Sequence, residues 1–212
     1  MRIRTILTIA AFLFSMRAKS QITQVEVSGG FRGSGMTILM NQPIDEKKQF
    51  SFLSLAFLEK FYSKEYSKLD ENAVVGAVFY NIGKGLSIGP AFAANNLGGF
   101  QKKMSFLYIK PSKQFTLVAF PSVVLYKDRI DGEIFVQLQY KRSLKKDWGI
   151  FAQLQAVANW RAFSQLARSS QQFRIGPSYK SFQFGIGINT DQYGTLVNPR
   201  FNALFFVRKV IN

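Results

Sequence analysis

The stretch Trp148–Trp160, W-G-I-F-A-Q-L-Q-A-V-A-N-W, alternates between two chemically different sets of side chains. Successive side chains of an extended strand point to opposite faces, so its even-numbered residues share one face. That face is apolar throughout, whereas the odd-numbered face carries Gln153, Gln155 and Asn159. Between the two tryptophans the strand spans roughly 40 Å, or about 30 Å after a tilt of ~40°. This length matches a bilayer's hydrocarbon core with its interfacial belts, so the stretch predicts a membrane-crossing strand.

The same period of two recurs along the chain and predicts an all-β fold. Residues 134–140 and 182–188 alternate apolar side chains with Gln, Gly and other small or polar residues. The expected strands are 22–31, 34–41, 49–61, 72–81, 86–95, 100–110, 114–126, 132–143, 148–160, 169–180, 182–190 and 198–209. Twelve is an even number, as single-chain bacterial barrels require, and links 62–71, 161–168 and 191–198 are expected as the longer outer loops. The predicted fold is an antiparallel up-and-down transmembrane β-barrel over residues 21–212.

The first hairpin leaves the strand count open between twelve and ten. Gly29, Gly30, Gly33 and Gly35 bracket its turn, and glycine inside a strand weakens pairing. Residues 21–41 are therefore either two strands of the wall or a periplasmic or lumen-filling segment. In the second case ten strands remain.

The first twenty residues have the features of a secretory signal peptide. Arg2 and Arg4 precede the apolar run 5–16, and Ala18-Lys19-Ser20 has the small-x-small pattern of a cleavage site. An anchoring helix is the alternative, but about 12 apolar residues fall short of the ~20 that span a bilayer. We expect cleavage before Gln21.

The net charge of the chain restricts the classes of partner that we expect. The chain has a net charge of +16, and removing residues 1–20 removes four basic residues, which leaves 24 basic against 12 acidic residues, or +12. An exported basic chain favours outer-membrane lipid, lipopolysaccharide or other outer-membrane proteins as partners over nucleic acid.

Two residue types are missing from the sequence, and their absence restricts the chemistry. Without cysteine there is neither a disulfide nor a thiolate metal site. Without histidine there is no Ser-His-Asp triad, no His-assisted membrane protease or phospholipase site and no histidine-ligated zinc. We therefore expect no enzyme activity, no cofactor and no metal.

Taken together, the chain resembles the outer-membrane β-barrel proteins of Gram-negative bacteria over residues 21–212, without a specific family motif. The Ser20-Gln21 junction and the Asn/Lys/Phe-rich mature chain are similar to those of Bacteroidetes barrels. The chain departs from the terminal aromatic residue typical of proteobacterial barrels, although Phe205 and Phe206 lie near its end. The resemblance implies an outer-membrane location and a porin-like, structural or accessory role.

Polar and charged side chains are predicted to line the lumen. Two strands joined near Lys145 place Gln137 and Gln139 opposite Gln153 and Gln155, within one register step. The remaining inward-facing charged residues are expected to be Lys103, Glu133, Lys141, Arg174, Arg200 and Arg208. This set is either a polar, basic path for a solute or a hydrogen-bonded plug that satisfies buried amides, and small barrels tend to be filled.

Aromatic side chains at the strand ends are expected to mark the membrane interfaces, where Trp and Tyr are enriched. The candidates are Trp148, Trp160, Tyr140 and Tyr179. A soluble periplasmic or secreted barrel that binds a lipid or another hydrophobic ligand is the alternative. In that protein the Trp148/Trp160 face would line the cavity, and Gln153 and Gln155 would meet solvent.

Overall fold

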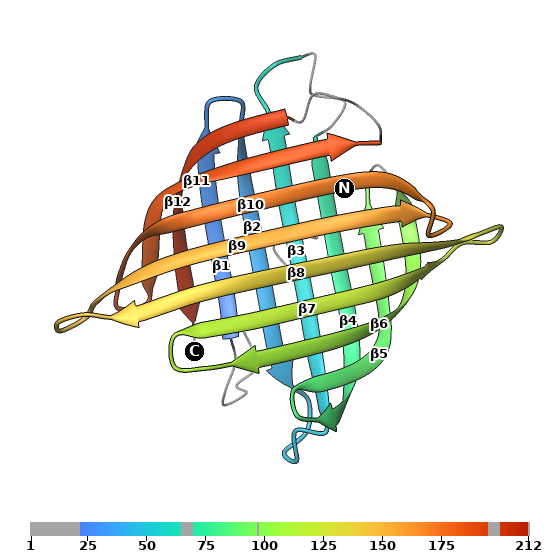
Figure 1. Ribbon diagram of the computed structural model, residues 1–212, viewed down its shortest axis with the longest axis horizontal. Helices are drawn as coiled ribbons and strands as arrows, with labels where there is room; N and C mark the ends of the chain where they lie inside the picture. Colours follow the sequence, from blue (N-terminus) through green and yellow to red (C-terminus); the bar gives the residue numbers. More distant parts are fainter. Residues whose placement is uncertain (1–21, 65–69, 97, 195–199, 212) are drawn as a thin grey trace, which may run out of the picture.

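The computed structural model describes residues 22–64, 70–96, 98–194 and 200–211, which form one closed β-barrel (Figure 1). The proposed signal peptide, residues 1–20, lies outside the described residues. The strands are β1 (Ile22–Gly30), β2 (Gly33–Pro43), β3 (Phe50–Phe61), β4 (Glu71–Gly83), β5 (Leu86–Asn95), β6 (Gly99–Pro111), β7 (Phe115–Leu125), β8 (Ile130–Ser143), β9 (Trp148–Arg161), β10 (Gln165–Tyr179), β11 (Phe182–Tyr193) and β12 (Arg200–Ile211). Within these residues, no helix has the length and apolar character needed to cross a membrane.

The twelve-strand prediction is confirmed, and the ten-strand alternative is wrong. The glycine-rich first hairpin forms β1 and β2, which pair with each other over eight register positions. β1 also pairs antiparallel with β12, so the hairpin closes the barrel.

One predicted loop is wrong. Residues 161–168 were expected to form a long outer link, but β10 begins at Gln165 and pairs with β9 from Arg161 onward. The chain reverses through a tight turn in which Ala162 and Phe163 both have positive φ. A register shift between Leu166 and Arg168 lets the polar segment stay in the ladder.

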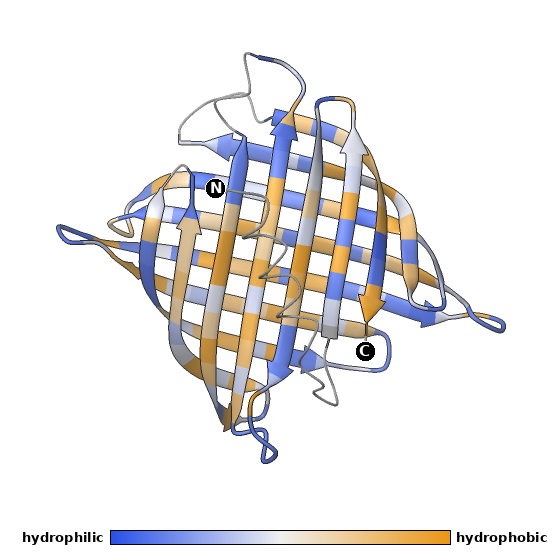
Figure 2. Cartoon of the chain, turned by 180° about the vertical axis from the view of Figure 1, so that it is seen from behind, coloured by the Kyte–Doolittle hydropathy of each residue, from blue (hydrophilic) through white to orange (hydrophobic). Residues whose placement is uncertain are grey.

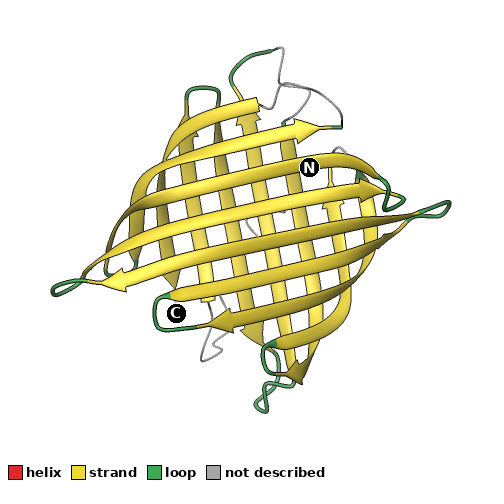
Figure 3. Ribbon diagram, in the orientation of Figure 1, coloured by secondary structure: helices red, strands yellow, loops and turns green. Residues whose placement is uncertain are grey.

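Each strand pairs antiparallel with its sequence neighbours, so the wall follows chain order and the even strand count brings both ends of the chain to one rim. We call the rim where β1 begins and β12 ends the terminus-side rim, and the opposite one the loop-side rim. In Figure 1 the near wall, which includes β7–β10, crosses the far wall of β2–β4 at a steep angle. The connections are turns and loops at the two rims (Figure 3).

Apolar side chains face outward around the barrel. On β9, Leu154 is 52% exposed on the outer surface, whereas its neighbour Gln153 is 4% exposed and points inward. Figure 2 shows hydrophobic and hydrophilic residues alternating along the strands, with hydrophilic residues concentrated in the turns. A strand with a period of two separates its polar and apolar side chains in this way.

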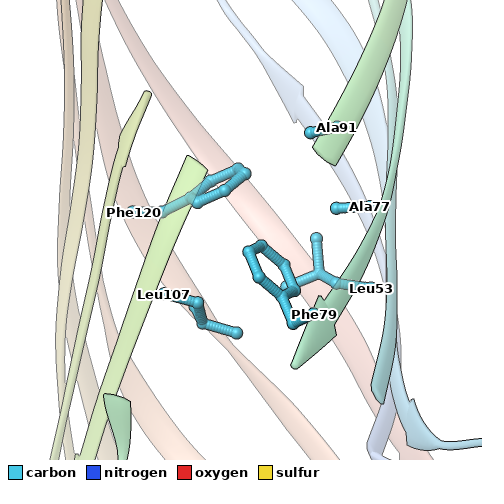
Figure 4. Packing of buried hydrophobic residues seen from close by; sticks show 6 residues of the cluster. All are labelled: Leu53, Ala77, Phe79, Ala91, Leu107 and Phe120. Carbon is cyan, nitrogen blue, oxygen red and sulfur yellow. The ribbon is translucent and has the colours of Figure 1, made fainter. Parts of the chain in front are cut away.

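Part of the interior beside β3–β7 is apolar. Leu53, Ala77, Phe79, Ala91, Leu107 and Phe120 form a buried cluster (Figure 4). The rings of Phe79 on β4 and Phe120 on β7 meet edge to face at 5.7 Å. The lumen is therefore packed on this side with side chains from facing parts of the wall.

Candidate functional site

A buried ionic network fills the lumen beside β1 and β9–β12. The carboxylate of Glu26 on β1 accepts from Arg174 Nε at 3.1 Å and from Arg208 at 2.5 and 2.9 Å. All three residues are almost fully buried, and Arg174 is 2% exposed. Burying a charge is costly unless it is paired and hydrogen-bonded, and here one carboxylate serves two guanidinium groups.

Amides and rings complete the coordination of these arginines. Arg208 Nη1 donates to Gln153 Oε1 at 2.7 Å, and Gln139 Nε2 donates to the same oxygen at 3.2 Å. Arg174 Nη1 donates to Asn189 Oδ1 at 2.8 Å. The guanidinium of Arg208 also lies 4.8 Å from the centre of the Phe151 ring. We call Glu26, Arg174, Arg208, Gln139 and Gln153 the ionic plug.

A second ion pair joins β6 to β8. Lys103 Nζ lies 2.7 Å from Glu133 Oε1, and Asn159 Nδ2 donates to the other oxygen at 2.6 Å. Lys103 is 6% exposed. Both oxygens of the Glu133 carboxylate therefore have a partner, as a buried carboxylate requires.

A cavity of about 410 Å³ occupies the part of the lumen toward the loop-side rim. Glu26 and Arg174 of the ionic plug form part of its lining, as do Lys103, Glu133 and Asn159. Gln155 and Gln172 contribute amides from neighbouring strands. The plug and the apolar cluster occupy the terminus-side part of the lumen and bound the cavity on that side.

An arginine spans the barrel near the loop-side rim. Arg168 on β10 donates from Nη1 to Glu71 Oε2 on β4 at 2.6 Å, although these strands lie on opposite sides of the wall. Its Nε and Nη2 bind both oxygens of Asp191 on β11, at 3.0 and 2.9 Å. The Tyr193 ring lies 5.0 Å from the guanidinium. We call the Glu71–Arg168–Asp191 contact the crossbar.

The described lining of the cavity mixes apolar with polar and charged residues, and its charged residues are not predominantly basic. Its ionisable carboxylates are Glu26, Glu59, Glu71, Asp131, Glu133 and Asp191, and its basic residues are Lys103, Arg129, Arg161, Arg168 and Arg174. Six carboxylates against five basic groups leave a net charge near −1. The predicted basic lumen is therefore not confirmed, because carboxylates distant in sequence meet the inward-facing arginines.

The other predicted lumen residues lie at different depths. Gln137 is buried opposite Gln155, which accepts a bond from Gln153 Nε2 at 3.4 Å. The Arg200 guanidinium lies 5.2 Å from the Tyr193 ring, near the loop-side rim. Lys141 is exposed near the terminus-side rim. The predicted set is thus spread along the lumen.

Three of the four predicted interface aromatics gather near the terminus-side rim. Trp148 packs on Tyr179 with ring centres 4.9 Å apart, and Tyr140 packs on Phe115 at 5.0 Å. The fourth, Trp160, lies at the opposite end of β9. Their role at a membrane interface stays a prediction.

Sequence reasoning missed Glu26, Glu71, Arg168 and Asp191. The period of two predicts an inward side chain for Glu26. A single acidic residue on the lumen face of a strand could therefore have indicated a partner for the inward arginines. Arg168 and Asp191 fell in segments expected to be loops, so no facing direction was assigned to them. Glu71 contacts Arg168 from six strands away, and the local sequence pattern of either strand does not indicate such a contact.

Comparison with known proteins supports the fold. No family model matches the sequence, and no curated protein sequence matches it. The solved NanC porin is 5% identical, with a TM-score of 0.50 over 91% of this chain and 100% of that one. An outer membrane channel from Pseudomonas putida F1 is 9% identical (TM-score 0.49, 93% and 97% covered), and the KdgM porin in complex with disordered oligogalacturonate is 10% identical (TM-score 0.48, 91% and 100%). The resemblance to outer-membrane β-barrels is thus confirmed at the level of the fold.

Proposed function

We propose that this chain is an integral outer-membrane β-barrel without enzymatic activity, whose resting lumen is closed toward the terminus-side rim. It is exported by residues 1–20 and acts as a porin-like or structural component with a blind polar cavity open toward the loop-side rim. Sequencing of the mature N-terminus tests the export step, with Gln21 as the expected first residue.

The opposite placement of Gln153 and Leu154 on β9 carries the membrane assignment. A soluble lipid-binding barrel would turn Leu154 inward around its ligand and Gln153 toward water. Here the amide is buried and the leucine is exposed, as it is in a barrel whose outer solvent is lipid. Exposed leucine, valine and phenylalanine side chains on most of the other strands extend this surface around the wall.

Extraction of the membrane fraction tests the integral barrel. We expect the mature protein to stay with the membrane through alkaline and high-salt washes and to leave it only in detergent. Release by an alkaline wash without detergent would overturn the membrane assignment.

The ionic plug and the apolar cluster support a closed resting state. We expect purified wild-type protein in planar bilayers to give no steady conductance. A variant with Glu26→Ser, Arg174→Ser and Arg208→Ser removes the three charges together, so no lone charge stays buried, and it is expected to conduct. Steady wild-type conductance would contradict closure, and a silent triple variant would contradict the plug as the barrier.

A further inference from the structure

The positive charge of the protein is concentrated at the terminus-side rim. Residues 21–212 have a net charge of +12, and the turns and strand ends of this rim contain eleven basic and three acidic residues, or +8. Lys47 and Lys48 share their turn with Asp45 and Glu46, and Lys141 is on the lumen face of β8. The other eight basic residues, all exposed, define what we call the basic rim: Lys84, Lys110, Lys113, Arg142, Lys145, Lys146, Lys180 and Lys209. Asp147 is the single acidic residue among the turns that carry them.

At three positions of the basic rim, the backbone conformation does not favour lysine. Lys84, Lys146 and Lys180 have φ values of 52°, 57° and 52°, in the left-handed region that favours Gly, Asn and Asp. Lys48, in the β2–β3 turn of the same rim, has a φ of 54°. A residue that does not match the conformational preference of its position is expected to have a functional role there. What lysine adds over asparagine here is a positive charge at the end of a long side chain.

Aromatic pairs on the outer surface fix the depth of this charge. Phe50 on β3 packs on Tyr80 of β4 at 5.4 Å, and the Trp148–Tyr179 pair lies on β9 and β10, on the opposite side of the wall. The Nζ atom of Lys180 lies 5.3 Å from the centre of the Tyr179 ring, and that of Lys209 lies 5.6 Å from Phe182. Aromatic belts of membrane proteins lie at the depth of the headgroups. The turn lysines therefore reach the headgroup phosphates.

We infer that the basic rim binds the phosphates of anionic phospholipids in the leaflet that faces both termini. This inference rests on the proposed function, since it requires the barrel to cross the bilayer. The rim selects lipids by charge, because several lysines around one circumference meet phosphates that bear no compensating choline or ammonium group. Each basic side chain at an anionic surface strengthens binding by about fivefold.

Lipid selectivity of the mature protein in vesicles tests the inference. Spin-labelled phosphatidylglycerol and phosphatidylcholine report the relative affinity of each lipid for the barrel by electron paramagnetic resonance. We expect wild-type protein to prefer phosphatidylglycerol by about tenfold or more, from the per-residue effect above, and to lose the preference in high salt.

The test variant replaces three rim lysines by asparagine: Lys84→Asn, Lys146→Asn and Lys180→Asn. Asparagine tolerates positive φ, so this variant is expected to fold as well as the wild type while losing three charges. The matched control carries Lys60→Gln, Lys102→Gln and Lys127→Gln, which removes three exposed charges nearer the loop-side rim. We expect the preference to collapse in the first variant and to persist in the control.

Two results would overturn the inference: no preference in the wild type, or an equal loss in both variants, which would reflect net charge alone. Binding of an acidic protein by the rim without any lipid preference would count equally against it. Alkaline extraction of the same vesicles separates the two proposals. Protein that washes out refutes the membrane assignment, whereas protein that resists the wash and shows no preference refutes the lipid site alone.

Discussion

Glu26 on the first strand and Arg208 on the last strand are register partners across the seam that closes the barrel, and their side chains form an ion pair with a 2.5 Å contact. The same carboxylate binds Arg174 on β10. One buried acidic residue therefore joins the two ends of the wall and holds two arginines inside it. The same group therefore contributes a contact across the seam and part of the filling of the lumen.

Glu26→Gln is expected to destabilise the barrel by about 3–5 kcal/mol, because removing one partner of a buried pair leaves uncompensated charge. Urea unfolding of the folded protein in lipid vesicles measures the change. Glu46→Gln in the exposed β2–β3 turn is the control, with an expected effect within about 0.5 kcal/mol.

The coupling between the two seam residues distinguishes a lost ion pair from a general loss of packing. Arg208→Met alone leaves Glu26 paired with Arg174, so the double variant with Glu26→Gln is expected to be more stable than the two single effects predict by addition. Additive effects would contradict the shared network.

The crossbar is expected to limit the rate at which small molecules enter the cavity from the loop-side rim. Glu71→Gln weakens the contact between β4 and β10 while Arg168 keeps Asp191, so we expect a loss of about 1–3 kcal/mol and faster opening of the loop-side rim. The chain contains no cysteine, so Ala93→Cys in the cavity lining provides a single label site. Its reaction with a small maleimide is expected to accelerate several-fold in the Glu71→Gln background.

A cysteine outside the cavity shows whether Glu71→Gln changes maleimide labelling in general. Ser112→Cys lies in the exposed β6–β7 turn and is expected to label at the same rate in both backgrounds. Unchanged labelling of the cavity cysteine would mean that the crossbar does not limit entry.

The hydrogen bonds of Asp45 predict that the stability of the β2–β3 turn, at the terminus-side rim, depends on pH. Its carboxylate accepts backbone N–H bonds from Phe50 at 2.6 Å and from Gln49 at 3.1 Å, and the Phe50 bond is the main cause that lowers the pKa of Asp45 below its ordinary value. A lowered folded-state pKa stabilises the turn above the unfolded pKa, and this contribution is lost as pH falls through the folded value.

Nuclear magnetic resonance of the folded protein in micelles measures this titration. The Phe50 and Gln49 amide signals are expected to shift together at a pH below the ordinary carboxyl range. Asp45→Asn abolishes that step and serves as the control. A titration at the ordinary value, or one that persists in the variant, would contradict the role of the turn.

The strands and their facing directions could be predicted because the period of two is a local property of the sequence. It gave Gln153 and Leu154 opposite faces and brought Lys103 and Glu133 to the same interior. The glycines of the first hairpin kept a ten-strand alternative open, because glycine inside a strand weakens pairing. A Cβ atom on Gly30 would lie 2.4 Å from the Ala203 carbonyl oxygen, and one on Gly33 would lie 2.5 Å from that of Lys60. These glycines allow close approach of neighbouring backbones.

Contacts across the lumen were beyond prediction for a different reason. Which residues meet across the barrel depends on strand tilt, stagger and lumen width, and these are properties of the closed wall. Arg168 was also placed in a loop because residues 165–168 lack an apolar alternation. The predicted basic lumen is not confirmed, because the arginines were visible in the pattern and their distant carboxylates were not.

The outer surface makes a depth-dependent prediction that separates a membrane barrel from a soluble one. Leu154 in the middle of β9 and Ile130 at the first residue of β8 are almost equally exposed, at 52% and 51%. In a bilayer, Leu154→Arg is expected to cost about 2–4 kcal/mol and Ile130→Arg about 0–1 kcal/mol, because the cost of a lipid-facing charge falls toward the interface.

Urea unfolding in vesicles compares the two variants, with Leu154→Ala and Ile130→Ala as size controls. In water, two equally exposed positions would respond alike and weakly, because surface substitutions change stability by about 0.5 kcal/mol or less. A large cost at Leu154 alone therefore requires lipid around the middle of the wall. Equal, small costs at both positions would instead place solvent there and favour the soluble barrel.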